Sequence, residues 1–432
     1  MNYALCIAFT SACGIDLEEY NGVKSMTAGG NLSGSYTVAL KNDGTVWAWG
    51  FNGFYGQLGD GTQIDKTTPV QVKGKDGVGF LEDVDAVFAG EAHTVALKND
   101  GTVWAWGFND FYGQLGDGAS DGVTHKRTPV QVKGGASGDE FLKDVIKVFA
   151  GGYHTLAITR DGKLWAWGRN STGQLGYGTG GTGAGINIPT PVQVKGKDGV
   201  GFLEDVIKVF AGGSHTLAIT GDGKLWTWGY NQFGQLGNDT IPTGTSTSGN
   251  ISYSPTPVRV KGGTSGDEFL EGVSEVFASA NYTVAIKNDG TLWAWGENND
   301  GQLGNGNTSW YSTPVQEKSG ATDWVSVSGG NRHTIALKMN GTIWAWGRNV
   351  EGQLGKGDGY SANNSENWEP KKLGEASDLI GVAGGYNHSA AIRRSGIVWT
   401  WGSNGTGQLG DNTVPTTGTN NYRSKPGVVR WK

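Results

Sequence analysis

The tetrapeptide Trp-x-Trp-Gly occurs seven times in this chain of 432 residues, at intervals of 51 to 67 residues. The first tryptophans of the seven copies are Trp47, Trp104, Trp165, Trp226, Trp293, Trp344 and Trp399. Repeats of this period are typical of solenoids and propellers, in which each unit buries its apolar surface against its neighbours. We therefore expect one body, and not the two or three domains that the length alone would suggest.

The third unit shows what each repeat encodes. Short apolar runs rich in β-branched and aromatic residues, such as Thr155–Ile158 and Leu164–Trp167, predict β-strands. Asp161 and Gly162 between these runs predict an antiparallel hairpin with a type I′ turn. Both faces of the runs carry apolar side chains, which indicates a sheet covered on both sides, as in a propeller blade.

A second motif, Gly-Gln-Leu-Gly, also occurs seven times, and an asparagine stands shortly before each copy. Asparagine tolerates left-handed backbone conformations and hydrogen-bonds its own backbone in turns. We interpret these asparagines as structural corners: Asn52, Asn109, Asn170, Asn231, Asn298, Asn349 and Asn404.

The two chain ends carry pieces of the repeat. The chain enters the pattern at Val23–Gly30 and ends after Pro426–Val429, the counterpart of Thr190–Val194. We expect these N- and C-terminal segments to pair in one blade and to close an all-β, seven-bladed β-propeller, because closure removes exposed strand edges. In this division residues 23–432 form a single propeller, and residues 1–22 form a leader or an N-terminal arm.

In order along each unit, Gly-Gly-x-His-Thr, Asp-Gly-x-x-Trp-x-Trp-Gly, Asn-x-x-Gly-Gln-Leu-Gly and Thr-Pro-Val resemble the repeat of the regulator-of-chromosome-condensation family. The resemblance covers about residues 23–430 and implies a seven-bladed propeller, here expected to be a bacterial member. The family includes nucleotide-exchange factors for the Ran GTPase, a light sensor with tryptophan in Gly-Trp-Arg-His-Thr, and binders of a partner protein. The nearest light-sensing motifs here carry Asn331 and Tyr386 at the tryptophan place, so the resemblance favours partner binding.

Charge and cysteine usage limit the partners and the location. With 40 acidic and 34 basic residues the net charge is −6, and no basic run predicts a nucleic-acid partner. Cys6 and Cys13 lie in an apolar start that resembles the end of a bacterial lipoprotein signal, with a lipid on Cys13 as the sole membrane link. This interpretation predicts an extracytoplasmic or surface-tethered bacterial protein. The alternative is an N-terminal arm packed on the body of a cytoplasmic protein.

Five of the six histidines fall at one position of the repeat, where the first and fifth units carry Tyr36 and Tyr282. They are His93, His154, His215, His333 and His388. Metal ligands converge within about 2–2.5 Å of one ion, which blades spread around a ring do not do. We therefore interpret each imidazole as hydrogen-bonded within its own blade. Because the sequence has no nucleophile elbow, phosphate loop or paired-cysteine motif, we predict no catalytic residue, no metal and no cofactor.

The loops between Gly-Gln-Leu-Gly and Thr-Pro-Val differ among the units, whereas the framework barely varies. Binding surfaces are commonly built from divergent loops on a rigid frame. Aromatic residues dominate the binding energy of protein interfaces, so those in and beside the loops are candidate partner contacts. They are Phe54, Tyr55, Phe111, Tyr112, Phe233, Trp310, Tyr311 and Trp368. The alternative is that these rings cap their own blades.

These observations predict a monomeric, non-enzymatic scaffold that binds a protein, or a glycan, through variable loops on one face. The alternative from a different class is a guanine-nucleotide-exchange-type regulator of a small GTPase. A third hypothesis is a carbohydrate-active enzyme, which needs two carboxylates about 5–10 Å apart in one pocket.

Overall fold

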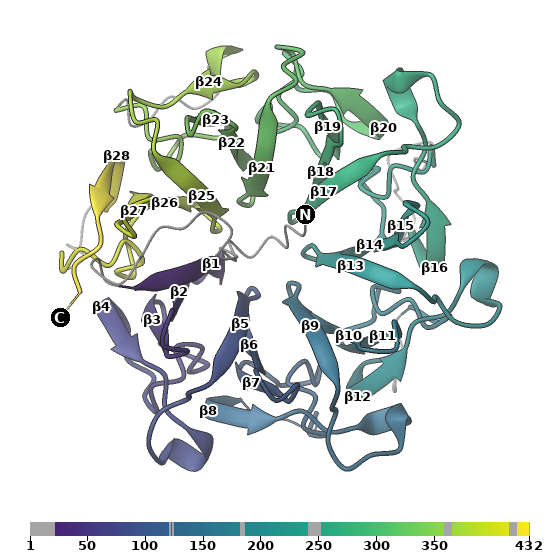
Figure 1. Ribbon diagram of the computed structural model, residues 1–432, viewed down its shortest axis with the longest axis vertical. Helices are drawn as coiled ribbons and strands as arrows, with labels where there is room; N and C mark the ends of the chain where they lie inside the picture. Colours follow the sequence, from purple (N-terminus) through teal and green to yellow (C-terminus); the bar gives the residue numbers. More distant parts are fainter. Residues whose placement is uncertain are drawn as a thin grey trace.

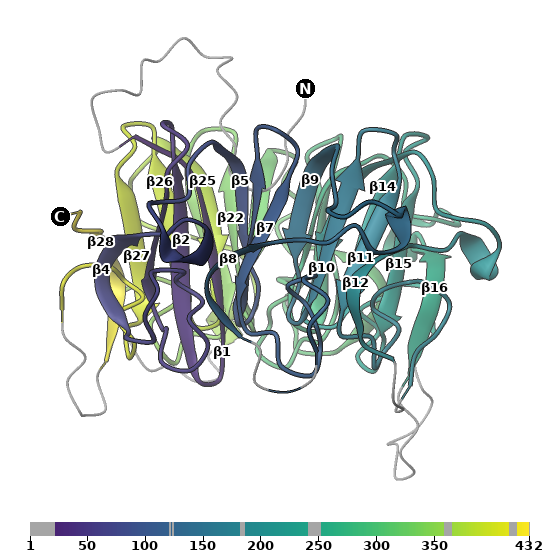
Figure 2. The ribbon, with the colours of Figure 1, turned by 90° about the horizontal axis from the view of Figure 1, so that it is seen from below.

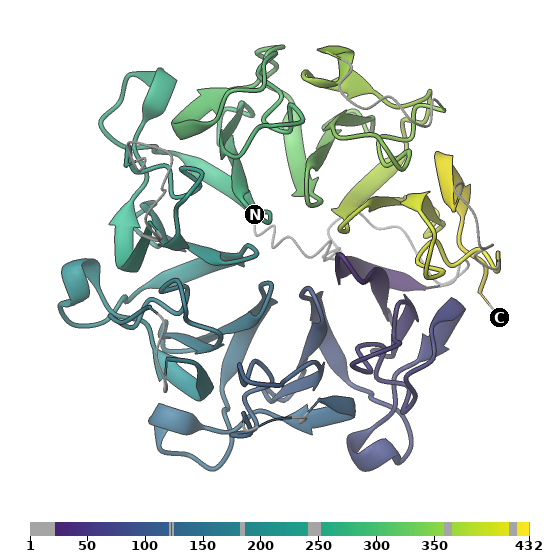
Figure 3. The same cartoon turned by 180° about the vertical axis from the view of Figure 1, so that it is seen from behind.

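The chain folds into seven four-stranded antiparallel sheets, arranged as blades around a central channel (Figure 1). This computed structural model describes residues 22–120, 122, 125–181, 186–240, 252–357, 365–413 and 421–431. Within them the expected all-β, seven-bladed propeller is confirmed. The blades follow one another in chain order, and the ring is closed when seen from either side (Figure 3). Of the expected leader, residues 1–22, all but Gly22 lie outside the described residues.

Each blade is built from four consecutive strands, with the first at the channel and the fourth at the rim. The channel strands are β1 (Val23–Asn31), β5 (Val84–Ala89), β9 (Val145–Ala150), β13 (Val206–Ala211), β17 (Val273–Ala278), β21 (Trp324–Gly329) and β25 (Leu379–Gly384). The second strands are β2 (Gly34–Lys41), β6 (His93–Lys98), β10 (His154–Thr159), β14 (His215–Thr220), β18 (Tyr282–Lys287), β22 (His333–Lys338) and β26 (His388–Arg393). The third strands are β3 (Val46–Gly50), β7 (Val103–Gly107), β11 (Leu164–Gly168), β15 (Leu225–Tyr230), β19 (Leu292–Gly296), β23 (Ile343–Gly347) and β27 (Val398–Ser403). The rim strands are β4 (Lys66–Gln71), β8 (Lys126–Gln131), β12 (Ile188–Gln193), β16 (Tyr253–Arg259), β20 (Tyr311–Gln316), β24 (Lys371–Lys372) and β28 (Tyr422–Val428).

Helical structure in the described residues is limited to short 3-10 turns. They are η1 (Lys75–Gly77), η2 (Gly135–Ser137), η3 (Lys197–Gly199), η4 (Gly263–Ser265) and η5 (Ser365–Asn367). The first four follow rim strands, and each packs against the rim strand of the next blade. Among the residues that the structure describes, no helix reaches the length and apolarity needed to span a membrane.

The predicted hairpins are confirmed, but their turn is of another type. β10 and β11 pair antiparallel, and the same pairing joins the second and third strands of every blade. In the first blade, the Lys41 N–H donates to Thr45 O at 2.9 Å and the Gly44 N–H donates to Lys41 O at 3.0 Å. Gly44 has a φ of +79°, whereas Asp43 before it keeps a negative φ. A type I′ turn needs two positive φ values, so the loop is instead a type I turn followed by a left-handed glycine.

The second tryptophan of each Trp-x-Trp-Gly motif joins neighbouring blades. Trp106 is fully buried, and its indole N–H donates to Gln57 O of the preceding blade at 2.9 Å. A buried indole needs a partner for its N–H, so every junction carries this bond. The seven pairs are Trp49–Gln408, Trp106–Gln57, Trp167–Gln114, Trp228–Gln174, Trp295–Gln235, Trp346–Gln302 and Trp401–Gln353.

The asparagines before Gly-Gln-Leu-Gly act as the structural corners that the sequence predicts. Asn52 is buried, and its Oδ1 accepts the Leu58 N–H at 3.0 Å. The other six asparagines accept the equivalent leucine N–H at 2.9 to 3.1 Å. Each bond satisfies a backbone donor inside a loop that is buried against the next blade.

The prediction that the two chain ends pair in one blade is wrong. β1 pairs with β2 in the first blade and β28 pairs with β27 in the seventh, so both terminal blades are complete on their own. The reason is the phase of the repeat. The Thr-Pro-Val strand pairs with the Trp-x-Trp-Gly strand just before it, as Gln71 does with Trp47. The first and last strands, β1 and β28, therefore each belong to a complete blade.

Side-chain contacts between blades 7 and 1 close the ring. Thr37 Oγ1 lies 3.1 Å from His388 Nε2, in the same relation as at other junctions. The ring of Trp431, close to the C-terminus, packs edge-on against Trp47 and Trp49, with centroid distances of 6.2 and 5.8 Å. This junction thus has the framework contacts of the others, and Trp431 adds an aromatic latch.

Candidate functional site

One end of the propeller carries the parts that vary between blades. His93 at the start of β6 pairs with Gly107 at the end of β7, so the tips of the first hairpins and the loops after the third strands emerge together. We call this end the loop face; it lies on the lower side of the ring in Figure 2. It contains the Gly-Gln-Leu-Gly loops and one mouth of the central channel.

A ring of imidazoles lies beneath the loop face, and its hydrogen bonds cross the blade junctions. His93 Nε2 is 3.0 Å from Thr155 Oγ1 of the next blade, and the Thr155 hydroxyl donates to Gln114 O at 2.8 Å. Because that hydroxyl proton is already used, His93 Nε2 carries the proton that it donates, which leaves Nδ1 as an acceptor without a partner. The prediction of bonds within one blade is wrong, because the side chain leaves its strand toward the neighbouring blade.

Burial keeps the ring histidines neutral. Desolvation lowers the pKa of His93, His154, His215 and His333 to about 3 and that of His388 to about 4. The glycine three residues earlier follows from this packing, because a Cβ on Gly151 would collide with the His154 imidazole. In the described part of the chain, no group of three or more His, Cys, Asp and Glu side chains is placed to hold a metal ion.

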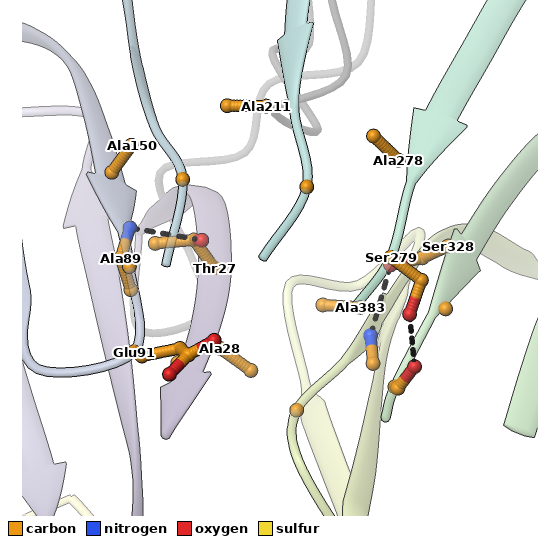
Figure 4. A pocket seen from close by; sticks show the side chains of 18 of the residues that line it. Thr27, Ala28, Ala89, Glu91, Ala150, Ala211, Ala278, Ser279, Ser328 and Ala383 are labelled. Carbon is orange, nitrogen blue, oxygen red and sulfur yellow. Dashed lines mark hydrogen bonds between the residues drawn. The ribbon is translucent and has the colours of Figure 1, made fainter. Parts of the chain in front are cut away.

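The central channel forms a cavity of about 170 Å³ that is lined by all seven channel strands (Figure 4). Four phenylalanines from blades 2 to 5 and smaller side chains from blades 6, 7 and 1 occupy equivalent lining positions: Phe88, Phe149, Phe210, Phe277, Ser328, Ala383 and Thr27. At the mouth, backbone bonds link the hairpin tips of successive blades. The Gly152 N–H donates to Gly212 O at 3.0 Å, and the Gly213 N–H donates to Ser279 O at 3.1 Å. These bonds hold the hairpin tips together around the mouth.

Aromatic rings cross the loop face over blades 1 to 3. We call this set the aromatic row: Phe51, Phe54, Tyr55, Phe108, Tyr112 and Tyr153, with successive ring centroids 4.6 to 5.9 Å apart. Tyr55 packs on Phe108 of the second blade, and Tyr112 packs on Tyr153 of the third. The rings therefore bridge junctions and do not simply cap their own blades. The guanidinium of Arg169 lies 5.3 Å from the Tyr112 ring and ends the row.

Two of the predicted partner-binding residues on blades 1 and 2 are exposed to solvent. Phe54 is 59% exposed within the row, and Phe111 is 68% exposed in the loop that also carries Tyr112. Phe111 has a φ of +62°, which is a costly conformation for a bulky residue. Its carbonyl accepts a bond from Asn187 Nδ2 of the next blade at 2.9 Å, which helps to hold it there. A strained loop that displays an aromatic ring is typical of a binding loop.

The other predicted aromatic residues lie on blades 4 to 6. Phe233 packs against Trp310 with a centroid distance of 4.8 Å, and the Trp310 indole donates to Asn299 Oδ1 at 2.9 Å, so these two form a separate group. Tyr311 begins β20, and its hydroxyl accepts a bond from a loop asparagine at 3.1 Å. Trp368 packs on Gly301 of the preceding blade, a position held by rim-strand residues at the other junctions. The structure thus brings neither Tyr311 nor Trp368 to the aromatic row.

Blades 5 and 6 present charges to the loop face, and these charges largely satisfy one another. Glu297 is buried and contacts Arg332 Nη2 at 3.1 Å, and Asn281 Nδ2 donates to it at 2.9 Å. Arg332 and Arg348 also reach Asp300, at 3.3 and 3.9 Å. The aromatic side therefore offers the larger unpaired surface to a partner.

Sequence reasoning missed several residues that complete this face: Phe51, Phe108, Tyr153, Arg169 and Glu91. A usable signal exists in the sequence. The residue directly after each Trp-x-Trp-Gly is of five different types in the seven units: Phe51, Phe108, Arg169, Tyr230, Glu297, Arg348 and Ser403. Variation at one place within an otherwise uniform motif indicates a position that the shared framework does not fix.

Comparisons with known proteins agree with this architecture. Residues 181–431 match the family described as RCC1-like domain, and residues 43–97 and 100–158 match the Regulator of chromosome condensation (RCC1) repeat. The chain is 32% identical to Ultraviolet-B receptor UVR8 of Arabidopsis thaliana, over 87% of this chain and 77% of that protein. It is 30% identical to Regulator of chromosome condensation of Xenopus laevis, over 83% of this chain and 79% of that protein.

Other similarities concern the propeller alone. E3 ubiquitin-protein ligase HERC2 of Homo sapiens is 28% identical over 88% of this chain, but the match spans 7% of that protein. Human WBSCR16 aligns with a TM-score of 0.67 at 24% identity, over 85% of this chain and 86% of that one. Yeast RCC1 (Prp20) bound to Kap60 aligns with a TM-score of 0.68 at 20% identity, over 100% of this chain and 88% of that one. At these identities the two structures support the fold and no more.

Proposed function

Because the chain belongs to the regulator-of-chromosome-condensation (RCC1) repeat family, we propose that it is a non-enzymatic scaffold whose loop face binds a partner protein. The observation that carries this proposal is the aromatic row. It is continuous over three blades, and two residues in or beside it, Phe54 and Phe111, are more than half exposed. Regular strands below the row hold it in place, so a partner meets a preformed surface.

The energetics support partner binding at this place. An aromatic side chain that becomes buried against a partner contributes ~2 kcal/mol or more to binding when it is an interface hot spot. Burying Phe54 and Phe111 would remove two large apolar groups from water at little cost in side-chain entropy. The self-paired charges of blades 5 and 6 would then border the interface, where charge pairs affect orientation more than affinity.

The test compares two matched double variants. Phe54→Ser with Phe111→Ser removes exposed rings from the loop face, whereas Val78→Ser with Val200→Ser removes even more exposed apolar groups from the turns at the rim. A partner is captured with the wild-type chain, and its affinity for all three proteins is measured by calorimetry. We expect at least a tenfold loss for the loop-face variant and no change for the rim variant. Equal affinities for the three proteins would contradict the proposal.

Two further partner classes are tested in parallel. A glycan could stack on the same tyrosines, and a glycan array probed with the same variants separates it from a protein. The alternative function, a guanine-nucleotide-exchange-type regulator, is supported by the similarity to Regulator of chromosome condensation. It predicts accelerated release of a fluorescent GDP analogue from a small GTPase. Release rates that stay at the intrinsic value across a panel of small GTPases would reject it.

For the location we propose export and surface attachment in a bacterium, on the strength of the apolar start that ends at Cys13. The relatives named above are eukaryotic and do not support this part of the proposal. Mass spectrometry of the protein from its native host tests it, because export predicts trimming and lipidation at Cys13. An intact Met1 in that host would reject it.

A further inference from the structure

The channel mouth on the loop face contains an isolated acid. Six equivalent positions at the hairpin tips carry Glu91, Gly152, Gly213, Ala280, Asn331 and Tyr386 in blades 2 to 7. Glu91 is the one charged residue among all those that line the described cavity. Its side chain projects into the cavity in Figure 4. A lone carboxyl group in an apolar and glycine-rich wall needs an explanation.

Nothing nearby fully compensates this carboxyl group. Burial raises the pKa of Glu91 to about 7, and a hydrogen bond from the Tyr153 hydroxyl and the charge of Arg169 only partly oppose this rise. None of the ion pairs among the described residues involves Glu91. Arg169 is engaged elsewhere, because its Nε donates to Ser171 Oγ at 2.9 Å and its guanidinium lies over Tyr112. The carboxyl group therefore keeps capacity to accept hydrogen bonds.

The neighbouring hairpin tips carry no side chain next to this carboxyl group, which lies close to where their Cβ atoms would stand. The next two hairpin tips carry glycine, and a Cβ at Gly152 would lie 2.7 Å from Glu91 Oε1, while one at Gly213 would lie 3.4 Å from it. Beyond the mouth, alanine methyl groups such as those of Ala150 and Ala211 line the cavity. An incoming group thus meets one carboxylate at a mouth that also carries Asn331 and Tyr386, with an apolar wall beyond it.

We infer that the channel mouth binds a single primary ammonium group, the side chain of a lysine that the partner protein presents to the loop face. This inference rests on the proposed function for the source of the lysine. An ammonium group is compact and can use the free lone pairs of Glu91, and its unbranched stem suits a narrow apolar mouth. Arginine prefers to bind both carboxylate oxygens in a planar fork, which is disfavoured where Tyr153 already donates to this carboxylate.

The test uses the full chain and small probes, so it does not depend on knowing the partner. Nα-acetyl-lysine methylamide and its uncharged isostere Nα-acetyl-norleucine methylamide are titrated by calorimetry and by saturation-transfer NMR. We expect the wild-type chain to bind the lysine probe at least tenfold more tightly than the norleucine probe. Glu91→Gln should abolish that preference. Glu351→Gln, which removes an acid elsewhere on the same face, should keep it.

A second variant guards against an indirect effect of Glu91→Gln. Gly213→Ala adds one methyl group beside Oε1, and alanine is already present at the equivalent Ala280, so this variant should fold. It should weaken the lysine probe severalfold and leave the melting temperature within a few degrees of wild type. Equal affinity for both probes in the wild type, or a lysine preference that survives Glu91→Gln, would overturn the inference. Loss of partner capture in the loop-face variant with an intact lysine preference would leave the ammonium site standing.

Discussion

Acid should destabilise this propeller through its ring of buried histidines, and one substitution isolates the effect. His154 is fully buried, its Nε2 lies 3.0 Å from Thr216 Oγ1, and its Nδ1 has no partner. His154→Tyr removes the titrating group with a residue that blades 1 and 5 already use at this position, as Tyr36 and Tyr282. In those blades the tyrosine hydroxyl donates to the carbonyl of the histidine in the next blade at 2.6 Å. The fold therefore has a precedent for the variant.

The magnitude follows from proton linkage. The pKa of His154 is about 3 in the folded chain, against about 6.5 for an unfolded chain, so the unfolded state binds one more proton between these values. The stability that depends on the neutral imidazole is complete above pH 6.5 and is lost as the pH falls toward 3. As the pH falls below 6.5, each ring histidine thus lowers the free energy of unfolding by ~1.4 kcal/mol per pH unit. At pH 5 the loss per histidine, relative to neutral pH, is ~2 kcal/mol.

Two buried acids act in the opposite direction. Burial raises the pKa of Glu91 to about 7 and that of Glu275 to about 8, so between pH 4.5 and 7 the folded state binds more protons at these two sites. Near pH 5.5 unfolding takes up about five protons at the histidines and releases about two at the glutamates. The net uptake of about three protons corresponds to a slope of ~4 kcal/mol per pH unit in the free energy of unfolding. The free energy of unfolding should therefore fall steeply as the pH is lowered toward 5.

The assay is denaturant unfolding at intervals from pH 5 to 7. Below about pH 6, His154→Tyr should reduce the slope of unfolding free energy against pH by ~1.4 kcal/mol per unit, and the difference between the slopes should fade toward pH 7. Tyr36→His, the reverse change in the first blade, should increase the slope by the same amount. Slopes that match wild type in both variants would refute the assignment of the ring as buried and neutral.

Three other perturbations have defined outcomes. Trp431→Ala should lower the free energy of unfolding by about 2 kcal/mol, because it removes the latch between blades 7 and 1. Trp310→Ala on the exposed loop face should cost less than about 1 kcal/mol, and equal costs would argue against the latch. Thr155→Val should cost about 1–3 kcal/mol, since it leaves the buried His93 Nε2–H unpaired and removes one of the two donors to the Gln114 carbonyl. A loss smaller than about 0.5 kcal/mol would contradict the tautomer assigned above. Glu275→Gln should become more stable than wild type by ~1.4 kcal/mol for each unit that the pH rises from 4.5 to 8, because burial without a partner for Oε1 raises the pKa of Glu275 to about 8. A pH-independent difference would reject this reasoning.

Local chemistry explains what could be predicted. Strands, hairpins and asparagine corners depend on residues close together in the chain, and seven copies of each pattern made the blade number evident. The difference between their loops and those of later units also indicates Phe54, Tyr55, Phe111 and Tyr112 as candidate partner contacts, and that role stays a prediction. Glu91 and Tyr153 were missed because neither has a sequence neighbour that indicates its role.

By itself, the sequence determined that this chain is a ring of seven similar blades with much of its variation in one set of loops. Only the tertiary structure decided which strands begin and end a blade, that His93 bonds to Thr155 and not within its own sheet, and that Glu91 lies beside Gly152 and Gly213. The physical reason is the same in each case. The side-chain contacts named here join different blades across some sixty residues or more, and such contacts depend on the angle and spacing at which complete sheets pack around the channel.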